Sequence, residues 1–540
     1  MMVMMGTARR SFASDSSSAA SSSSHPNSDA CLHTLRVLLD NIQARRLQRN
    51  DKDYSTLQKE INSNGCDSDK SLSVQELSTN LCRQYLDLYH SNSSVNDLEG
   101  AQATNSHREE HKRDFLLELA VKAKPDADSV MQIVRSLLKD GGNSVDSSNL
   151  KIRKLRIACV PKYEMLFHTL LAEAEHCIGM KFLVSLRYDI MNTIKFESSA
   201  RTCTDLDIQA LKYLDEDLKR MLVMWFSSGI LELRRISFDQ TPASIIETIA
   251  RNESVHPLKD LNDLKKRLGE NRRCYAFFHP SLQDEPLVFV HVALLPTIAK
   301  SMEEIDKLTK ASTHDQYYNL KSNFDPHCAV FYSINSTKRG LNGVELGTLL
   351  IKRVCSMLKT DYPDIHTFST LSPIPGFRKW LEGKLLHSGP KFVDDNLVTL
   401  EEKQKLASIF ECESIDVPRK LCYIHERSGW YKEEALLKIL KPLFMRLAAQ
   451  YLTVEKHRNR PLDPVARFHC KNGAEMYQLN WLADLSRKGM HQSMGMMINY
   501  RYSLETIEEN HFRYEDGGNI QVLKGVLMWL SHEQNRCSKL

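Results

Sequence analysis

A glycine-containing loop between an expected strand and an expected helix could hold a phosphate group. The short apolar stretch 329–335 leads into STKRGLNG, in which Gly340 and Gly343 permit close backbone approach or a positive φ. Apolar residues then recur at helical spacing from Glu345 to Lys359, and the unpaired N–H groups at the start of such a helix favour an anion. Spacing alone also fits an ordinary strand-to-helix turn, which is the commoner meaning of this pattern.

A serine lies where a second expected strand, Ile365 to Leu371, meets a turn. Pro373 and Pro375 follow Ser372, and two prolines fix φ and remove two backbone donors. The backbone therefore holds the Ser372 hydroxyl with little freedom, which suits a binding or catalytic position. A turn or capping serine is the simpler alternative.

A histidine near the end of a short expected helix could handle a proton. Asp463 and Pro464 form a cap and first-turn pair, Gly473 ends the helix, and His469 lies in its last turn. Because the negative end of a helix favours the imidazolium, we expect His469 to hold and deliver a proton near neutral pH. As one of twenty histidines, His469 is a weak candidate without further support.

The elements that would position these residues follow a serine-rich leader. We interpret residues 1–30 as a disordered leader or transit peptide, 31–229 as an all-α helical bundle used for scaffolding or subunit contact, and 230–540 as a mixed α/β domain. The expected fold class is therefore α+β. Within the second domain, the apolar run Pro286 to Leu295 predicts a strand buried on both faces, and His291 inside it is interpreted as a core residue rather than a ligand.

Composition narrows the possible partners. The net charge of +4 on 540 residues is small and the basic residues are dispersed, so nucleic acid is not expected as a partner. The thirteen cysteines include no CxxC pair, so neither a zinc site nor a disulfide framework is indicated. No apolar run is long enough to predict a membrane span.

Several stretches resemble the malonyl-CoA decarboxylase family. They are FYSINSTKRGLNGVELGTLLIKRV, FSTLSPIPGFRKWL, DPVARFHCKNGA, NYRY and the terminal SKL. The likeness extends over most of the chain from about Val74 onward. It implies that residues 230–540 have the fold of acetyl-CoA-dependent N-acetyltransferases and that a helical domain precedes them.

The resemblance also implies a site. Ser372 and His469 correspond to the catalytic pair, Tyr502 to a substrate-binding residue that donates a further hydrogen bond, and the glycine loop to the part that contacts malonyl-CoA. In one assignment Ser372 hydrogen-bonds the malonyl carboxylate or the enolate while His469 protonates carbon; in the other, His469 acts as a base and Ser372 accepts a proton. No metal or organic cofactor is expected, because the thioester itself takes up the electrons released by decarboxylation. The loop residues are Asn342, Gly343, Val344, Glu345, Leu346, Gly347 and Thr348.

Two other functions remain open. The acetyltransferase loop pattern is Gln or Arg, two residues, Gly, one residue, then Gly or Ala. Aligned on Gly343, this chain has Gly340 at the first position and Glu345 at the last, which disfavours acetylation of an amine. An acyl-CoA-dependent N-acyltransferase is nevertheless the second hypothesis, and a non-catalytic CoA-binding protein is the third.

The expected partners beyond the substrate are an import receptor and further copies of the chain. Ser538, Lys539 and Leu540 read as a peroxisomal import signal, and the mitochondrion and the cytoplasm are further candidate compartments beside the peroxisome. Family likeness implies a homo-oligomer, with a tetramer as the expected state.

Overall fold

The computed structural model describes residues 37–38, 73–90, 101–122, 124–139, 145–174, 177–200, 202–227, 229–309, 326–386 and 397–530. The expected leader and the tripeptide 538–540 lie outside these ranges. The chain forms two compact units, Met1–Leu218 and Lys219–Leu540. The boundary between the two units falls inside a helix that continues to Trp225. The boundary expected at Gly229 lies after that helix, where the sequence pattern changes.

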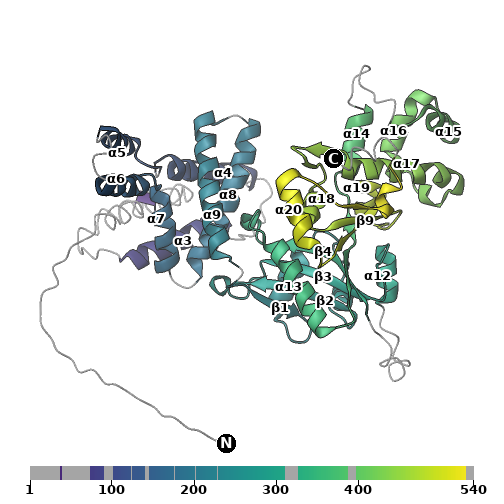
Figure 1. The fold of residues 1–540 in the computed structure, drawn as a ribbon, viewed down its shortest axis with the longest axis horizontal. Coiled ribbons are helices and arrows are strands. Elements are labelled where there is room, and N and C mark those ends of the chain that lie inside the picture. The colour runs from purple at the N-terminus through teal and green to yellow at the C-terminus, as the bar shows by residue number, and fades with distance from the viewer. Residues whose placement is uncertain are drawn as a thin grey trace, which may run out of the picture. The chain divides into compact units, whose positions relative to one another are not determined.

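The described part of the first unit is entirely helical, which confirms the fold expected for this half of the chain (Figure 1). Buried Asp189 on α8 ties three helices together: it accepts from the Tyr85 hydroxyl at 2.8 Å and lies 3.2 Å from Lys112 Nζ. The helices are α3 (Val74–His90), α4 (Ala101–Lys122), α5 (Ala127–Lys139), α6 (Val145–Ala158), α7 (Lys162–Glu173), α8 (Ile178–Ala200) and α9 (Asp205–Trp225).

The second unit is built on a mixed sheet, as expected. Its neighbouring strands are, in order, β1 (Glu232–Ile236), β2 (Arg272–Phe278), β3 (Val288–Leu295), β4 (Cys328–Ser336), β5 (Thr367–Thr370), β10 (Met497–Tyr502), β9 (Glu475–Asn480) and β11 (Val522–Leu523). Strands β4 and β5 are parallel, as are β9 and β11, and the other neighbours are antiparallel. Every residue of β3 is buried, as its continuous apolar run predicts.

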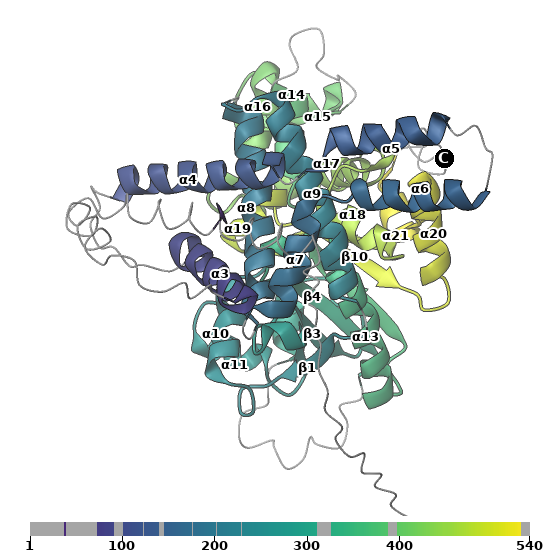
Figure 2. The same cartoon turned by 90° about the vertical axis from the view of Figure 1, so that its left-hand side faces the viewer.

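Helices cover both faces of this sheet. Cys274, Ala276 and Phe278 on β2 pack in one core cluster with apolar residues of α10 (Ala243–Asn252) and α11 (Leu261–Arg267). Phe277 points the other way, where Arg353 of α13 (Leu346–Asp361) lies over its ring at 5.6 Å. Figure 2 shows α10 and α11 on the opposite side of the strands from α13.

The C-terminal half of this unit adds further helices. They are α14 (Phe377–Leu386), α15 (Leu400–Phe410), α16 (Val417–Cys422), α17 (Glu434–Thr453), α18 (Pro464–Lys471), α19 (Arg487–Ser493), α20 (Ile507–Gly517) and α21 (Lys524–Leu527), besides α12 (Met302–Leu308) before β4. Pro442 lies inside α17, and one helix runs through it. Burial of Leu440, Leu443 and Phe444 around the proline supplies packing that offsets the lost backbone hydrogen bond.

Strands β4 and β5 separate beyond a defined point in the sheet. Their pairing ends at Phe331 and Thr370, after which β4 continues to Ser336. The chain after β5 instead forms β6 (Ser372–Pro373), which pairs with β10. The sheet therefore opens beside Ser372.

Candidate active site

A cavity of about 570 Å³ lies where the sheet opens. All seven loop residues predicted to contact substrate, 342–348, contribute to its lining, together with Ser372 and His469. Segments that are far apart in the sequence therefore meet around one space, with the start of α13 on one side and α18 on another.

Ser372 and His469 are in direct contact. Ser372 Oγ lies 3.1 Å from His469 Nε2, and both side chains are buried. Pairing of Ser372 with Ile498 on β10 positions the serine. The Asp463 carboxylate caps the start of α18 by accepting from two backbone N–H groups at 2.9 Å, which positions the helix that carries the histidine. The structure thus brings Ser372 and His469 together, as a paired role requires.

Hydrogen bonds on either side of the pair indicate which nitrogen of His469 carries the proton. The Ser372 hydroxyl donates to Thr370 Oγ1 at 2.8 Å, so its single proton is already used. His469 Nε2–H is then the donor to Ser372 Oγ. On the other side of the ring, Nδ1 accepts from the Tyr502 hydroxyl at 2.8 Å. The neutral ring therefore presents Nε2–H on its Ser372 side.

The expectation that His469 holds an extra proton near neutral pH is wrong for the unliganded site. Burial lowers the pKa of His469 to about 3. The ring is 4% exposed and stacks on Tyr500 with 4.5 Å between ring centroids. Loss of hydration around the whole ring outweighs the attraction between an imidazolium and the end of an eight-residue helix.

Tyr502 lies behind His469 rather than in the cavity wall. Its side chain is buried, and burial raises the pKa of Tyr502 well above its ordinary value, so the phenol stays protonated. Its hydroxyl donates to His469 Nδ1 and also interacts with the Asn472 side chain. We therefore interpret Tyr502 as a residue that acts on His469 through this hydrogen bond, and not as one that contacts substrate directly.

The start of α13 is linked to the end of α18. The Thr348 hydroxyl donates to Asn472 Oδ1 at 2.6 Å, and Lys471 forms an ion pair with half-exposed Glu345. The two helices also approach closely at Gly347, where an added Cβ would lie 2.9 Å from Phe468 Cζ. These contacts connect the glycine loop to the helix that carries His469.

The positive φ expected in the loop occurs at Gly343, with a value of 80°. Gly340 instead lies in a short 3₁₀ turn, Arg339–Leu341, and is buried there. Of the two glycines in the predicted phosphate loop, Gly343 is therefore the one whose conformation disfavours a side chain.

Comparison with known proteins gives consistent matches. Residues 124–226 match the family of malonyl-CoA decarboxylase N-terminal domains, and residues 229–539 match that of malonyl-CoA decarboxylase C-terminal domains. The mitochondrial malonyl-CoA decarboxylase of the goose Anser anser anser is 39% identical over 387 residues, which are 72% of this chain and 73% of the goose protein. The rat enzyme is also 39% identical, over 72% of this chain and 74% of its own length.

The chain belongs to the malonyl-CoA decarboxylase family. Solved structures of bacterial family members have the same fold. The enzyme from Rhodopseudomonas palustris is 32% identical with a TM-score of 0.63, over 85% of this chain and 96% of the bacterial one. The enzyme from Agrobacterium vitis is 29% identical with a TM-score of 0.65, over 86% and 96%.

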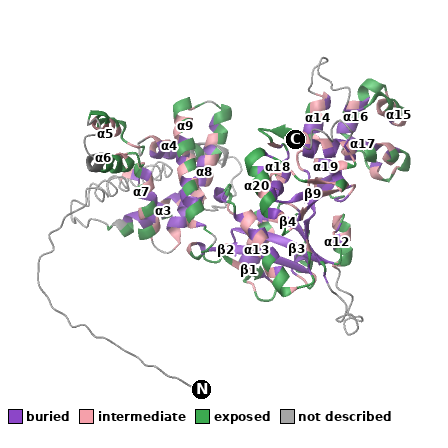
Figure 3. Cartoon of the chain, viewed as in Figure 1, coloured by how far each residue is buried: buried purple, intermediate pink, exposed green. Residues whose placement is uncertain are grey.

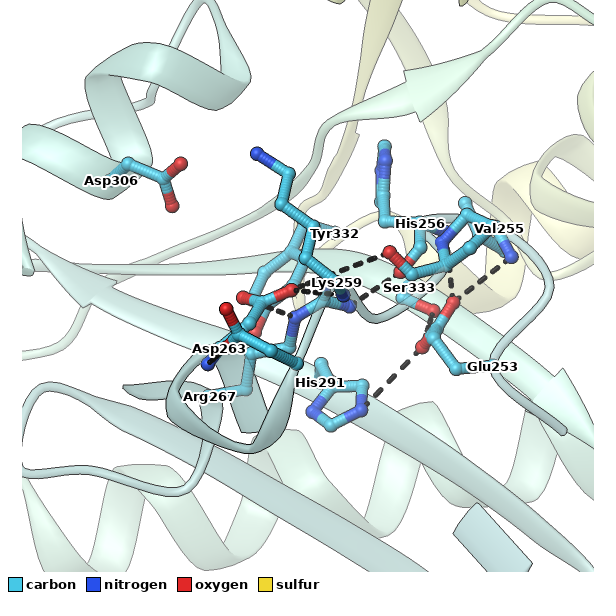
Figure 4. A network of polar contacts seen from close by, with 12 residues as sticks. Glu253, Val255, His256, Lys259, Asp263, Arg267, His291, Asp306, Tyr332 and Ser333 are labelled. Atoms are coloured by element: carbon cyan, nitrogen blue, oxygen red, sulfur yellow. Dashed lines mark hydrogen bonds and ion pairs between the residues drawn. The ribbon is translucent and has the colours of Figure 1, made fainter. Parts of the chain in front are cut away.

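In this family member a buried polar network lies behind the β4 wall of the cavity (Figure 4). Glu253, at the end of α10, accepts from the Ser333 hydroxyl at 2.7 Å and from the backbone N–H groups of Val255 and His256 at 2.9 Å. Val255 and Ser333 also line the cavity. The carboxylate therefore holds two pieces of the wall together.

His291 belongs to that network and not to the cavity lining. It is fully buried, its Nε2 lies 3.5 Å from Glu253 Oε2, and burial lowers the pKa of His291 to about 4. Neither ring nitrogen makes a hydrogen bond to any residue that the structure describes. The interpretation of His291 as a core residue is confirmed.

Sequence reasoning missed two polar residues of the site, Thr370 and Asn472. Thr370 accepts from Ser372 and from the backbone N–H of Tyr500, at 2.8 and 3.1 Å. Asn472 follows His469 by three residues within DPVARFHCKNGA. That helical spacing, which places both residues on one face, was the available signal.

Proposed function

We propose that this chain converts malonyl-CoA to acetyl-CoA and CO₂. The observation that carries the proposal is the contact of 3.1 Å between Ser372 Oγ and His469 Nε2, in a cavity that begins at the glycine loop. Family membership supplies the substrate, since the relatives with this fold are malonyl-CoA decarboxylases.

The loop and the start of α13 suit the CoA portion of the substrate. α13 has sixteen residues, so its first-turn N–H groups and dipole favour a phosphate. The residues of β4 beyond Phe331 line the path from this loop towards Ser372. An extended ligand could therefore place its phosphates at the loop and its acyl group at the catalytic pair.

The reaction breaks the bond between the α-carbon and the carboxylate. The electron pair of that bond moves into the thioester and forms an enolate as CO₂ leaves, after which one proton from solvent must reach the α-carbon. We assign to Ser372 a hydrogen bond to the malonyl carboxylate, for which its hydroxyl proton turns from Thr370 to the substrate, and to His469 the delivery of the proton. The carboxylate brings a negative charge beside His469, which favours its protonation and opposes the effect of burial.

Incubation of purified protein with malonyl-CoA, with and without an amine acceptor, tests this function. Formation of acetyl-CoA and CO₂ without an acceptor is the expected result. Release of free CoA that depends on the amine would support an N-acyltransferase instead. Binding of malonyl-CoA with neither product formed would support the third hypothesis, a non-catalytic CoA-binding protein.

We also propose a homo-oligomer in which helices α5 and α6 contact another copy. No residue of α5 is buried (Figure 3). Leu138 on this helix is 78% exposed. Ile157 on α6 is 69% exposed. Light scattering after size-exclusion chromatography should show a smaller assembly for Leu138→Asp than for wild type, whereas Lys139→Asp on the same helix should leave it unchanged.

For the compartment, we propose peroxisomal import through Ser538, Lys539 and Leu540. The goose and rat relatives are named mitochondrial, so mitochondrial targeting is the alternative. Within the part of the chain that the structure describes, no helix is sufficiently long and apolar to cross a bilayer. A fluorescent protein fused at the N-terminus, with and without the last three residues, should reach peroxisomes only when they are present.

A further inference from the structure

Asn472 has a hydrogen-bond donor without a partner in the cavity of the catalytic pair. Its side chain is 3% exposed and lines the cavity. Oδ1 accepts from the Thr348 hydroxyl, which fixes the orientation of the amide. Nδ2 makes no hydrogen bond of ordinary geometry to any residue that the structure describes, although the Asn472 side chain does interact with the Tyr502 hydroxyl. A buried donor of this kind destabilises the folded chain unless a ligand or water satisfies it.

The neighbouring donors of the site are already engaged. The Ser372 hydroxyl donates to Thr370, and the Tyr502 hydroxyl donates to His469. Nδ2 of Asn472 is therefore the donor of this group that remains available to an acceptor on a ligand.

The position of Asn472 on α18 indicates which acceptor it would meet. Asn472 ends this helix three residues after His469, so the two side chains project from one face. An enolate needs a proton at carbon and a hydrogen-bond donor at the adjacent oxygen. A neutral amide suits an oxygen that is uncharged in the substrate and gains charge during the reaction.

We propose that Asn472 Nδ2 donates a hydrogen bond to the thioester carbonyl oxygen of malonyl-CoA and stabilises the enolate formed there. This assignment rests on the proposed decarboxylation. It makes Asn472 a catalytic residue beside Ser372 and His469, with Thr348 as the residue that orients its amide.

One competing role is local. The Asn472 amide lies close enough to the Tyr502 hydroxyl to oppose, weakly, the effect of burial on the pKa of that phenol. If Asn472 served only to hold Tyr502, its removal would alter His469 without changing how the site recognises a carbonyl group. A binding experiment that isolates the carbonyl separates the two roles.

The experiment compares acetyl-CoA with S-ethyl-CoA, a thioether of similar size that lacks the carbonyl oxygen. Calorimetry with wild-type protein should show tighter binding of acetyl-CoA. In Asn472→Ala this preference should disappear while the affinity for S-ethyl-CoA stays the same. With malonyl-CoA, kcat should fall by about 10²–10³-fold, as for loss of one donor to an oxyanion.

Asn510→Ala is a matched control. Asn510 lies on α20 outside the cavity lining, and its amide donates to the Gly473 carbonyl at 3.2 Å, next to the end of α18. Its loss loosens the same helix end without removing a cavity donor, so the preference for acetyl-CoA should persist. Thr348→Val should show an intermediate loss of preference, and Thr348→Val combined with Asn472→Ala should be no worse than Asn472→Ala alone.

The assignment is overturned if wild type binds the two ligands equally, if Asn472→Ala retains the preference for acetyl-CoA, or if it weakens both ligands alike. These outcomes are distinct from failure of the proposed function. If wild type released no CO₂ from malonyl-CoA, decarboxylation would be rejected, while the two ligands would still report whether Asn472 contacts a thioester carbonyl.

Discussion

His469 and His291 are two buried histidines of the same unit with similar electrostatics and different surroundings. Their side chains are 4% and 0% exposed, and burial lowers their pKa values to about 3 and about 4. His469 nevertheless lines a cavity and hydrogen-bonds Ser372 and Tyr502. His291 lies on a central strand beside Glu253. A strongly lowered pKa therefore does not distinguish the proposed catalytic histidine from a core histidine, whereas lining a cavity does.

The residues around each imidazole ring explain why the two histidines have different proposed roles. Both nitrogens of His469 have oriented neighbours, so its tautomer is set and one N–H is presented beside the serine. Neither ring nitrogen of His291 makes a hydrogen bond to a residue that the structure describes, although this ring too stacks on a tyrosine, Tyr332, with 5.8 Å between centroids. Its contribution is to fill space behind β4 next to a carboxylate.

The largest expected difference between the two histidines is in turnover. His469→Asn should retain the fold and CoA binding and lower kcat by about 10²–10⁴-fold, because a positioned proton donor is removed. Ser372→Ala should lose turnover over a similar range. His291→Asn is the matched control and should keep kcat close to that of wild type. Wild-type turnover in His469→Asn or Ser372→Ala would remove that residue from the mechanism.

The network around His291 should instead matter for stability. Glu253→Ala leaves the Ser333 hydroxyl and the N–H groups of Val255 and His256 without their acceptor. We expect unfolding in urea to show a loss of about 3 kcal/mol, because several buried donors become unsatisfied. Glu253→Gln keeps one acceptor oxygen and should lose less. An unchanged urea midpoint for Glu253→Ala would show that the network does not support the wall.

Much of the fold and the central pair could be predicted from local patterns. The buried strand around His291, the helix after the glycine loop and the cap at Asp463 depend on residues close together in the chain, so periodicity and turn chemistry predict them. Ser372 and His469 themselves were singled out by a proline-bounded turn, a helix end and family resemblance. None of these patterns specifies a distance between residues 97 positions apart.

The protonation state and the supporting residues could not be predicted in this way. A helix end raises the affinity of a histidine for a proton, but burial by Tyr500 from β10 reverses the effect, and that contact exists only in the folded sheet. The Thr348 to Asn472 hydrogen bond joins residues 124 positions apart. Such contacts depend on how the strands are ordered, which the sequence pattern leaves open.

The lowered pKa that the two histidines share should make the folded chain less stable at acidic pH. Each has a folded-state pKa below the ordinary value, so the unfolded chain binds more protons than the folded one as pH falls below about 6.5. Stability should therefore fall with decreasing pH, by up to about 1.4 kcal/mol per pH unit for each histidine between about 6 and the folded-state pKa. His469→Asn and His291→Asn should each reduce this slope in urea titrations at pH 7, 6 and 5. If only one variant reduced the dependence of stability on pH, the histidine left unchanged in that variant would have an ordinary pKa in the folded chain, and its ring would be hydrated.

The smallest effect concerns the tautomer of His469. Tyr502→Phe removes the donor to Nδ1 and leaves the Nε2 contact with Ser372 in place. The neutral ring can then carry its proton on either nitrogen, and we expect kcat to fall about tenfold, equivalent to one lost hydrogen bond. KM for malonyl-CoA should change little, because Tyr502 does not line the cavity. A large rise in KM with unchanged kcat would instead mean that the phenol contacts substrate. It would also mean that the hydrogen bond to Nδ1 is not what gives His469 a role that His291 lacks.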